Sequence, residues 1–238
     1  MKSIIVDKRI DEECERSLLR LGFNVIKLPA LTMLGAAIES HPDSLFFRHK
    51  KQIFAYSDYV EVGLEVFSDI REYHRELSLN FVSETPKDAF PGDCALNALV
   101  MGDILFARKD SVSDRIIDHA KKEGLRVVNV RQGYPACATL ALGAKHAVTA
   151  DRGLHLVFSK EGIESLLISE GDITLPPYEY GFIGGSSFVY GSSVYFFGDL
   201  DTHRDSERIK IFLKRHGFSA ISLAKGVLRD LGGAVILE

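Results

Sequence analysis

The sequence has 238 residues and a formal net charge of −4, and 46% of its residues are hydrophobic. This balance is typical of a soluble globular protein and excludes a strongly basic nucleic-acid-binding surface. No apolar stretch approaches the roughly 18 residues of a membrane span, and the N-terminus lacks the pattern of a signal peptide. Three cysteines without CxxC spacing indicate a cytoplasmic protein with neither a disulfide framework nor a cysteine zinc site.

A short apolar strand that ends in aspartate recurs along the chain, each time followed by a helical pattern. The aspartates are Asp7, Asp58, Asp110, Asp151 and Asp199. Aspartate is a favoured helix N-cap, and we interpret these residues as caps. Four of the helices are predicted to stop at a glycine, which tolerates the positive φ needed after a helix end. These glycines are Gly22, Gly124, Gly162 and Gly217.

A third apolar strand follows each helix, and another strand precedes each aspartate strand. The preceding strands are SLFF, LNALV, TLAL, SSFVY and, at the C-terminus, AVIL. A period of about 40 to 50 residues is typical of a propeller or array. The set closes only if GGAVILE and MKSIIVD share a unit. The sequence therefore predicts one α/β domain over residues 1–238, a five-bladed pseudo-symmetric α/β-propeller of strand–strand–helix–strand units whose first unit is shared by both termini.

Units of this kind resemble the pentein superfamily, which includes arginine and agmatine deiminases, dimethylarginine hydrolases, glycine amidinotransferase and the ribosome anti-association factor. The segments QGYPACATLALG, AVTADRGL, LLISEGDITLPPYEYGFIGG and VYFFGDLDTH more narrowly resemble an uncharacterised bacterial family of that fold. The resemblance implies that the start of each first strand faces a central axis. These starts are residues 40–44, 91–95, 134–139, 181–186 and 230–235.

The catalytic members that this chain resembles hold an acid at the third start, a histidine at the fourth and a nucleophilic cysteine at the fifth. This sequence offers Cys137 between two alanines at the third start. It offers a glycine pair at the fourth, and at the fifth a glycine pair followed by Ala234. Asp93 alone matches a substrate-binding aspartate of the family. Ordinary deiminase chemistry is therefore not expected.

Reactive residue types still gather at the first three starts: His41, Asp43, Asp93, Cys94 and Cys137. A cysteine nucleophile needs a nearby base or a positive field, and His41 could supply it for Cys137 with Asp43 or Asp93 orienting the imidazole. The alternatives stay open, because free cysteines are often small buried hydrophobes and HPD at 41–43 is also typical of a turn.

A small polar ligand could be bound at the same axis. The candidate residues are Asp93, Cys94, Thr139, Gly184, Gly185, Ser186, Gly232 and Gly233, the glycines acting through backbone N–H groups. No cofactor is expected. No metal site is expected either, because DLDTHRD at 199–205 begins like a calcium loop but places Arg204 and Lys210 where Gly and Glu are needed.

Three functions remain open. The first is a binding protein for an amino-acid-like or guanidine-like molecule, which lacks the usual deiminase residues. The second is a cysteine-dependent amidine or amide hydrolase, acting on C–N bonds other than peptide bonds, with Cys137 or Cys94 as nucleophile and His41 as base. The third is a ribosome-interaction or protein-interaction factor, although the acidic net charge does not favour an RNA partner. Neither a nucleic-acid partner nor a membrane partner is expected.

Overall fold

The computed structural model describes residues 2–238, which form a mixed α/β fold of small sheets. Within that range there are five three-stranded sheets and one two-stranded sheet. In each three-stranded sheet the first strand pairs antiparallel with the middle strand, which pairs parallel with the third. The sheets, in this strand order, are β17 (Val235–Leu237), β1 (Ser3–Asp7), β2 (Asn24–Leu28); β3 (Phe46–His49), β4 (Gln52–Tyr56), β5 (Ser78–Val82); β6 (Leu99–Met101), β7 (Ile104–Ala107), β8 (Arg126–Asn129); β9 (Thr139–Leu142), β10 (His146–Thr149), β11 (Glu164–Leu167); and β13 (Ser187–Tyr190), β14 (Ser193–Phe196), β15 (Ser219–Ser222). The small sheet pairs β12 (Ile173–Thr174) with β16 (Leu228–Arg229).

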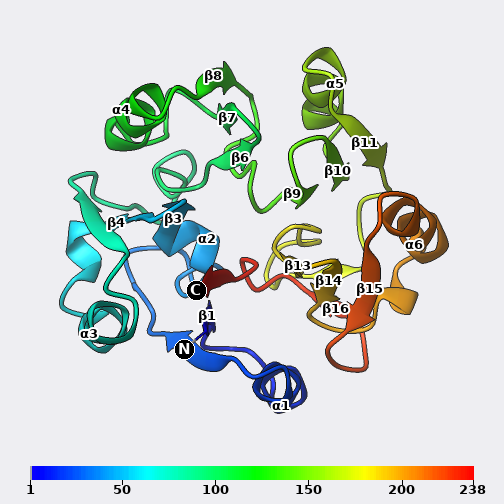
Figure 1. Ribbon diagram of the computed structural model, residues 1–238, viewed down its shortest axis with the longest axis horizontal. Helices are drawn as coiled ribbons and strands as arrows, with labels where there is room; N and C mark the ends of the chain where they lie inside the picture. Colours follow the sequence, from blue (N-terminus) through cyan, green and yellow to red (C-terminus); the bar gives the residue numbers. More distant parts are fainter. Residues whose placement is uncertain (1) are drawn as a thin grey trace.

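A helix connects the middle strand to the third strand of every three-stranded sheet, because parallel neighbours need a crossover. These helices are α1 (Glu12–Arg20), α3 (Leu64–Tyr73), α4 (Asp114–Lys122), α5 (Arg152–Lys160) and α6 (Ser206–Arg215). Figure 1 shows them around the outside of the molecule, with the sheets between them and the centre. Two 3₁₀ turns, η1 (Ser57–Tyr59) and η2 (Leu200–Thr202), follow β4 and β14. No helix in residues 2–238 has the length and apolar character needed to cross a membrane.

The two chain ends share one sheet, as predicted. Strand β17 pairs with β1 in the register Ser3↔Leu237 and Ile4↔Ile236. The N-terminal strand is therefore held between the C-terminal strand and β2, and Figure 1 shows the C-terminus beside β1.

The predicted helix ends are confirmed at all four glycines, but the predicted starts are mostly wrong. Gly22, Gly124, Gly162 and Gly217 adopt φ values between +70° and +82°. Asp151 caps α5 by accepting from the Leu154 amide at 2.8 Å. The other four aspartates cap no α-helix, because α1, α3, α4 and α6 have Asp11, Gly63, Ser113 and Asp205 at this position. Asp199 caps η2 instead, and Asp7 stays buried at the end of β1.

The hydrophobic core lies along the seams between neighbouring sheets. One cluster joins β6 and β7 to β9, β10 and α5. At its centre the rings of Phe106 and Phe158 meet edge to face, with centroids 5.1 Å apart. Burying each of these rings stabilises the fold by about 1.5–3 kcal/mol. This packing holds α5 and its sheet against the neighbouring sheet of β6 and β7.

The strand predicted at SLFF begins later in the structure than in the sequence prediction. Residues Pro42–Leu45 form the short helix α2, and β3 starts only at Phe46. Proline suits the first helical position because its fixed φ matches the helix and its missing N–H is not needed. His41 stands directly before this helix with an extended backbone and makes no capping bond, so its imidazole is free for other contacts.

Candidate functional site

Five lead-in segments, each directly before the first strand of a sheet, converge on the centre of the molecule. We define them in chain order as residues 40–45, 91–98, 133–138, 181–186 and 229–234. The side chain of Asn97 joins the first three of them. Its Nδ2 donates to the Asp43 carbonyl at 3.2 Å, and its Oδ1 accepts from the Ala136 amide at 2.9 Å.

Backbone hydrogen bonds complete the ring through the remaining lead-in segments. The Gly185 amide donates to the Cys137 carbonyl at 2.9 Å, which joins the third segment to the fourth. The Gly233 amide donates to the Gly185 carbonyl at 2.8 Å, and the Asp43 amide donates to the Gly232 carbonyl at 3.2 Å. The fifth segment therefore returns to the first, and side chains far apart in the sequence are held in fixed positions around the centre.

Glycine permits the close approach of the third, fourth and fifth segments. A Cβ on Gly184 would lie 2.4 Å from the carbonyl oxygens of Ala136 and Thr139. A Cβ on Gly185 would lie 2.0 Å from Asp230 Oδ1 and 2.6 Å from Cys137 Sγ. Real Cβ atoms do not come this close, so these glycines are required by packing.

A buried cluster of titratable side chains occupies the centre, formed by His41, Asp43, Cys137 and Asp230. The Cys137 thiol lies 3.4 and 3.5 Å from the two carboxylate oxygens of Asp230. His41 Nδ1 lies 3.9 Å from Asp230 Oδ1 and 4.0 Å from Asp43 Oδ1. Ligand atoms of His41, Cys137 and Asp230 all lie within 4.8 Å of one another. We call these four residues the central cluster.

The carboxylate of Asp230 is oriented by backbone donors. Its Oδ2 accepts from the Phe182 amide at 2.8 Å, and its Oδ1 accepts from the Gly232 amide at 3.0 Å. Charge-assisted bonds of this kind hold a side chain in one rotamer. Asp230 therefore presents its oxygens to Cys137 and His41 in a fixed geometry.

Asp7 lies on the opposite edge of the imidazole. Its Oδ2 is 3.7 Å from His41 Nε2, and Arg9 holds it from the far side, with Nη2 at 2.6 Å from Oδ2 and Nε at 2.9 Å from Oδ1. Ser40 Oγ donates to Oδ1 at 2.9 Å. Burial alone would raise the pKa of Asp7, but the hydrogen bonds from Arg9 outweigh it and lower the pKa. Asp7 is thus a fixed anion behind His41.

The electrostatics of the cluster do not favour a resting thiolate. Burial, together with the negative charges of Asp230 and Asp43, raises the pKa of the Cys137 thiol well above its usual range. Burial also raises the pKa of Asp43 to about 6; His41 opposes this shift and Asp230 adds to it. Burial is the main cause of both shifts, and the neighbouring carboxylates add to it. A cation bound here would relieve both.

A cavity of about 420 Å³ opens beside the cluster and is lined by His41, Asp43, Cys137 and Asp93 together with further carboxylates and aromatic rings. Asp88 and Glu179 supply the other carboxylates. The aromatic lining residues are Phe90, Tyr134, Tyr178, Tyr180 and Phe182. No lysine or arginine of residues 2–238 is among its lining residues. We call this space the acidic cavity.

Asp93 is partly satisfied within the acidic cavity. Its Oδ2 accepts from the Tyr134 hydroxyl at 2.6 Å, whereas its buried Oδ1 has no partner among the described residues. Burial, and then the bond to Asp93, raises the pKa of the Tyr134 phenol, which stays a neutral donor. One carboxylate oxygen is thus fixed and the other remains available.

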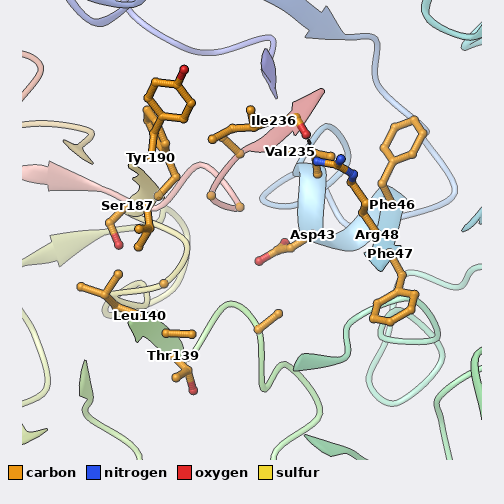
Figure 2. Close-up of a pocket in the computed structure, with 18 of the residues that line it drawn as sticks. Asp43, Phe46, Phe47, Arg48, Thr139, Leu140, Ser187, Tyr190, Val235 and Ile236 are labelled. Carbon is orange, nitrogen blue, oxygen red and sulfur yellow. Dashed lines mark hydrogen bonds between the residues drawn. The ribbon is translucent and has the colours of Figure 1, made fainter. Parts of the chain in front are cut away.

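A second cavity, of about 630 Å³, shares Asp43 with the acidic cavity. We call it the wide cavity. In Figure 2 Asp43 extends from α2 toward the middle of the view, with Thr139 and Ser187 across the open space. Arg48 also lines this cavity, but its guanidinium is turned toward Ile236 and donates to the Ile236 carbonyl. It therefore does not neutralise Asp43.

The other predicted site residues are placed as follows. Cys94 is buried and its thiol donates to the Pro91 carbonyl at 3.1 Å, while burial raises its pKa. Thr139 lines the wide cavity, with its buried hydroxyl unpartnered among the described residues. Gly184 also lines the wide cavity. Neither Cys94 nor Thr139 lines the acidic cavity.

Three of the four glycine amides predicted to hold a ligand donate to groups within the protein. Those of Gly185 and Gly233 donate to the Cys137 and Gly185 carbonyls. That of Gly232 donates to Asp230 Oδ1. Ser186 is fully buried, with its amide donating to Phe182 O and its hydroxyl to Ile183 O. The glycines allow close packing of the segments, and Gly184, Gly232 and Gly233 also line the wide cavity.

Sequence reasoning missed Asp230, Tyr134 and Asp7. Asp230 stands two residues before Gly232 in the fifth segment, where the sequence prediction considered only the missing cysteine. Tyr134 lies in the third segment, three residues before Cys137. Asp7 was read as a helix cap, although it faces His41. An inventory of every polar side chain in the lead-in segments would have found the first two.

The sequence matches the model of a protein family described as "Family of unknown function (DUF6873)" over residues 5–235. The chain belongs to this family. No curated protein shows a significant match to the sequence.

Solved structures of other proteins share the fold of this chain. An inosamine-phosphate amidinotransferase from Streptomyces griseus is similar with a TM-score of 0.59 and 14% identity, over 97% of this chain and 81% of that one. An agmatine deiminase from C. jejuni has a TM-score of 0.56 and 8% identity, over 93% and 87%. A dimethylarginine dimethylaminohydrolase adduct has 0.55 and 12%, over 93% and 92%. These are pentein proteins, and the predicted resemblance to that superfamily is confirmed for the fold.

The chain differs from the pattern that the resemblance implied at the centre. That pattern has an acid at the third segment and a cysteine at the fifth. Here the third segment carries Cys137 and the fifth carries Asp230, and the two side chains meet. The thiol and the acid thus stand in exchanged places, and the histidine comes from the first segment as His41.

Proposed function

We propose that this chain is a single pentein-like domain, a five-bladed ring of strand–strand–helix–strand units, that binds a small organic cation in the acidic cavity. The observation that carries the proposal is the lining, in which carboxylates and aromatic rings meet without a lysine or arginine among the described residues. Carboxylates pair with guanidinium or ammonium groups, and aromatic faces attract cations. A volume of about 420 Å³ suits a small molecule.

Asp93 is the residue we assign to the cationic group. It is only 5% exposed, and the hydroxyl of Tyr134 fixes one of its oxygens. Its unpartnered Oδ1 can accept from a ligand N–H without giving up an existing bond. Asp43, at the boundary of both cavities, can accept from a second N–H of the same group. This arrangement suits a planar guanidinium or amidinium, which presents several N–H donors.

The aromatic rings of the cavity provide faces for the cation and its aliphatic chain. Phe90 already carries the guanidinium of Arg108 at 4.8 Å from its ring centre. Tyr134 and Phe182 lie with their centroids 6.5 Å apart, and Tyr178 is more than half exposed. We expect the exposed Tyr178 to stand near the opening and to contact the distal part of the ligand.

The names of two structural neighbours are consistent with a guanidine-type ligand. One is named for agmatine and another for dimethylarginine, and both molecules carry a guanidinium-type cation. The support is of fold alone, since identities are 8% and 12%. The three free and buried cysteines fit a reducing compartment, and we propose a cytoplasmic location.

A calorimetric titration with agmatine tests this assignment when Asp93→Asn is compared with a matched control. Asp103→Asn removes an exposed carboxylate that is not among the lining residues of the cavity. The first change should weaken binding about tenfold or more, because a buried charge pair is lost, and the control should leave Kd unchanged. Equal affinity in both variants, or no binding to the wild type by agmatine or arginine, would overturn the proposal.

A second candidate is a hydrolase for C–N bonds other than peptide bonds. It is favoured by the thiol of Cys137 and the imidazole of His41, which lie within 4.8 Å of each other and line the same cavity. A bound amidinium would favour the thiolate by adding positive charge next to it. Turnover of an amidine or amide that Cys137→Ala abolishes and Cys94→Ala preserves would establish this activity. No turnover across a guanidine, amidine and amide series would reject it.

A further inference from the structure

Besides the organic-cation site, the centre of the molecule holds a set of side chains suited to a metal ion. His41, Cys137 and Asp230 offer one nitrogen, one sulfur and one oxygen atom within 4.8 Å of one another. All three are at least 95% buried. Neither ring nitrogen of His41 has a hydrogen-bond partner among the described residues. An imidazole that is this buried and wholly unpartnered is unusual, since buried polar groups are nearly always satisfied.

We propose that His41 Nδ1, Cys137 Sγ and Asp230 bind a divalent transition metal, with Zn²⁺ as the best fit. Zn²⁺ favours tetrahedral sites made of nitrogen, sulfur and carboxylate oxygen. Bond lengths of about 2.0–2.3 Å in a tetrahedron place ligand atoms about 3.5 Å apart. Cys137 Sγ lies 3.4 Å from Asp230 Oδ2, and His41 Nδ1 lies 3.9 Å from Asp230 Oδ1. These two distances are within a few tenths of an ångström of that spacing, and the three ligand atoms together need to draw in from at most 4.8 Å.

The groups that contact the proposed ligands resemble those that orient ligands in known metal sites. Metal-bound histidines usually direct the other ring nitrogen to a carboxylate, and Asp7 Oδ2 lies 3.7 Å from His41 Nε2. Arg9 and Ser40 fix Asp7. The Phe182 and Gly232 amides fix Asp230. Asp7, behind the ligand His41, and the ligand Asp230 are therefore both held in place by the protein itself.

Three protein ligands leave a fourth position open. Asp43 Oδ1 lies 4.0 Å from His41 Nδ1, on the side where both cavities meet. It is placed to be the fourth ligand or to accept from a metal-bound water. Three-ligand zinc sites with one open position are the kind found in enzymes. The sequence prediction brought His41 and Cys137 together but included no metal site, because Asp230 comes from a separate lead-in segment.

A cobalt titration tests the site directly. Metal-free protein, prepared with a chelator, is titrated with Co²⁺ and followed by absorbance. We expect binding of about one equivalent at the site, with a cobalt–thiolate charge-transfer band that Zn²⁺ abolishes. Cys137→Ser should remove the band. Cys94→Ser, which changes a similarly buried thiol outside the cluster, should keep it.

The band also separates this site from the other metal-binding candidate among the described residues. His146, Glu164 and His216 lie together at the surface, but they offer no thiol. Cobalt bound there would give no thiolate band. Absence of the band in wild-type protein, or its survival in Cys137→Ser, overturns the proposal.

Folding of each variant is checked by circular dichroism. If Cys137→Ser does not fold, X-ray absorption of the zinc-loaded wild type decides the question instead. A shell containing one sulfur supports the site, and a shell of only nitrogen and oxygen rejects it. Agmatine binding is measured on metal-free protein, so failure of the metal site and failure of the organic-cation site are read separately.

Discussion

Replacing Gly185 with alanine should destabilise the protein far more than a surface glycine substitution. Gly185 is not in the positive-φ region, so alanine there carries no backbone penalty of that kind. The new Cβ would lie 2.0 Å from Asp230 Oδ1 and 2.6 Å from Cys137 Sγ. Overpacking of a tight interior costs about 1–3 kcal/mol. Moving Asp230 also strains its two backbone hydrogen bonds, each contributing about 1.5–3 kcal/mol. We therefore expect a loss of about 3 kcal/mol or more in the free energy of unfolding.

Urea unfolding followed by circular dichroism measures this loss, with Gly191→Ala as the control. Gly191 has φ +59° and no atom within 4 Å of its added Cβ, so alanine there costs only the left-handed backbone penalty of about 1–2 kcal/mol. A 3 kcal/mol loss also corresponds to a fall of about 6–12 °C in Tm. Equal losses in the two variants would show that Gly185 is not held against Asp230 and Cys137, and would refute the packing described here.

Two further predictions concern single side chains. Cys137 should resist iodoacetamide in the native protein at neutral pH and react after unfolding, because it is 5% exposed and burial raises the pKa of its thiol; rapid labelling of the native state would contradict this. Asp205→Asn should cost about 2 kcal/mol at neutral pH, since Asp205 accepts from the Ser169 amide at 2.6 Å and pairs with Arg208. Burial pushes the pKa of Asp205 up, but these bonds outweigh it and lower the pKa to about 2. The stabilisation is therefore present above about pH 4 and lost as the pH falls toward 2. If the difference in unfolding free energy between the wild type and Asp205→Asn were the same at pH 4 and at pH 2, this explanation would be contradicted.

The repeated pattern of the sequence predicted the strands well because their hydrophobicity is set locally. An apolar run and a helix recur in order, and the strands of the three-stranded sheets lie close to their predicted places. The two-stranded sheet of β12 and β16 was not predicted. Capping was predicted poorly, because aspartate at a strand end has other partners available. At Asp7 the competing partners are the nearby Arg9 and, from another segment, Ser40 and His41.

The candidate site was only partly predictable. His41, Asp43, Asp93 and Cys137 were singled out as reactive residues at segment starts, and all four line the acidic cavity. Asp230 was missed because its contact with Cys137 joins residues 93 positions apart. The glycines are predicted as ligand donors, and the structure adds that their lack of Cβ allows the segments to pack closely. Such non-local packing has no signature in a single stretch of sequence.

We expect the acidic cavity to bind a small organic cation through the charge of its guanidinium group. Calorimetric titration at neutral pH with agmatine and with its urea isostere, in which an oxygen replaces one guanidinium nitrogen, tests this most directly. The two ligands share shape and differ in charge. The account predicts binding of agmatine and at least about tenfold weaker binding of the isostere, a difference of about 1.4 kcal/mol or more. Equal affinity for both, or preference for the urea, which keeps only the terminal ammonium charge, would contradict it.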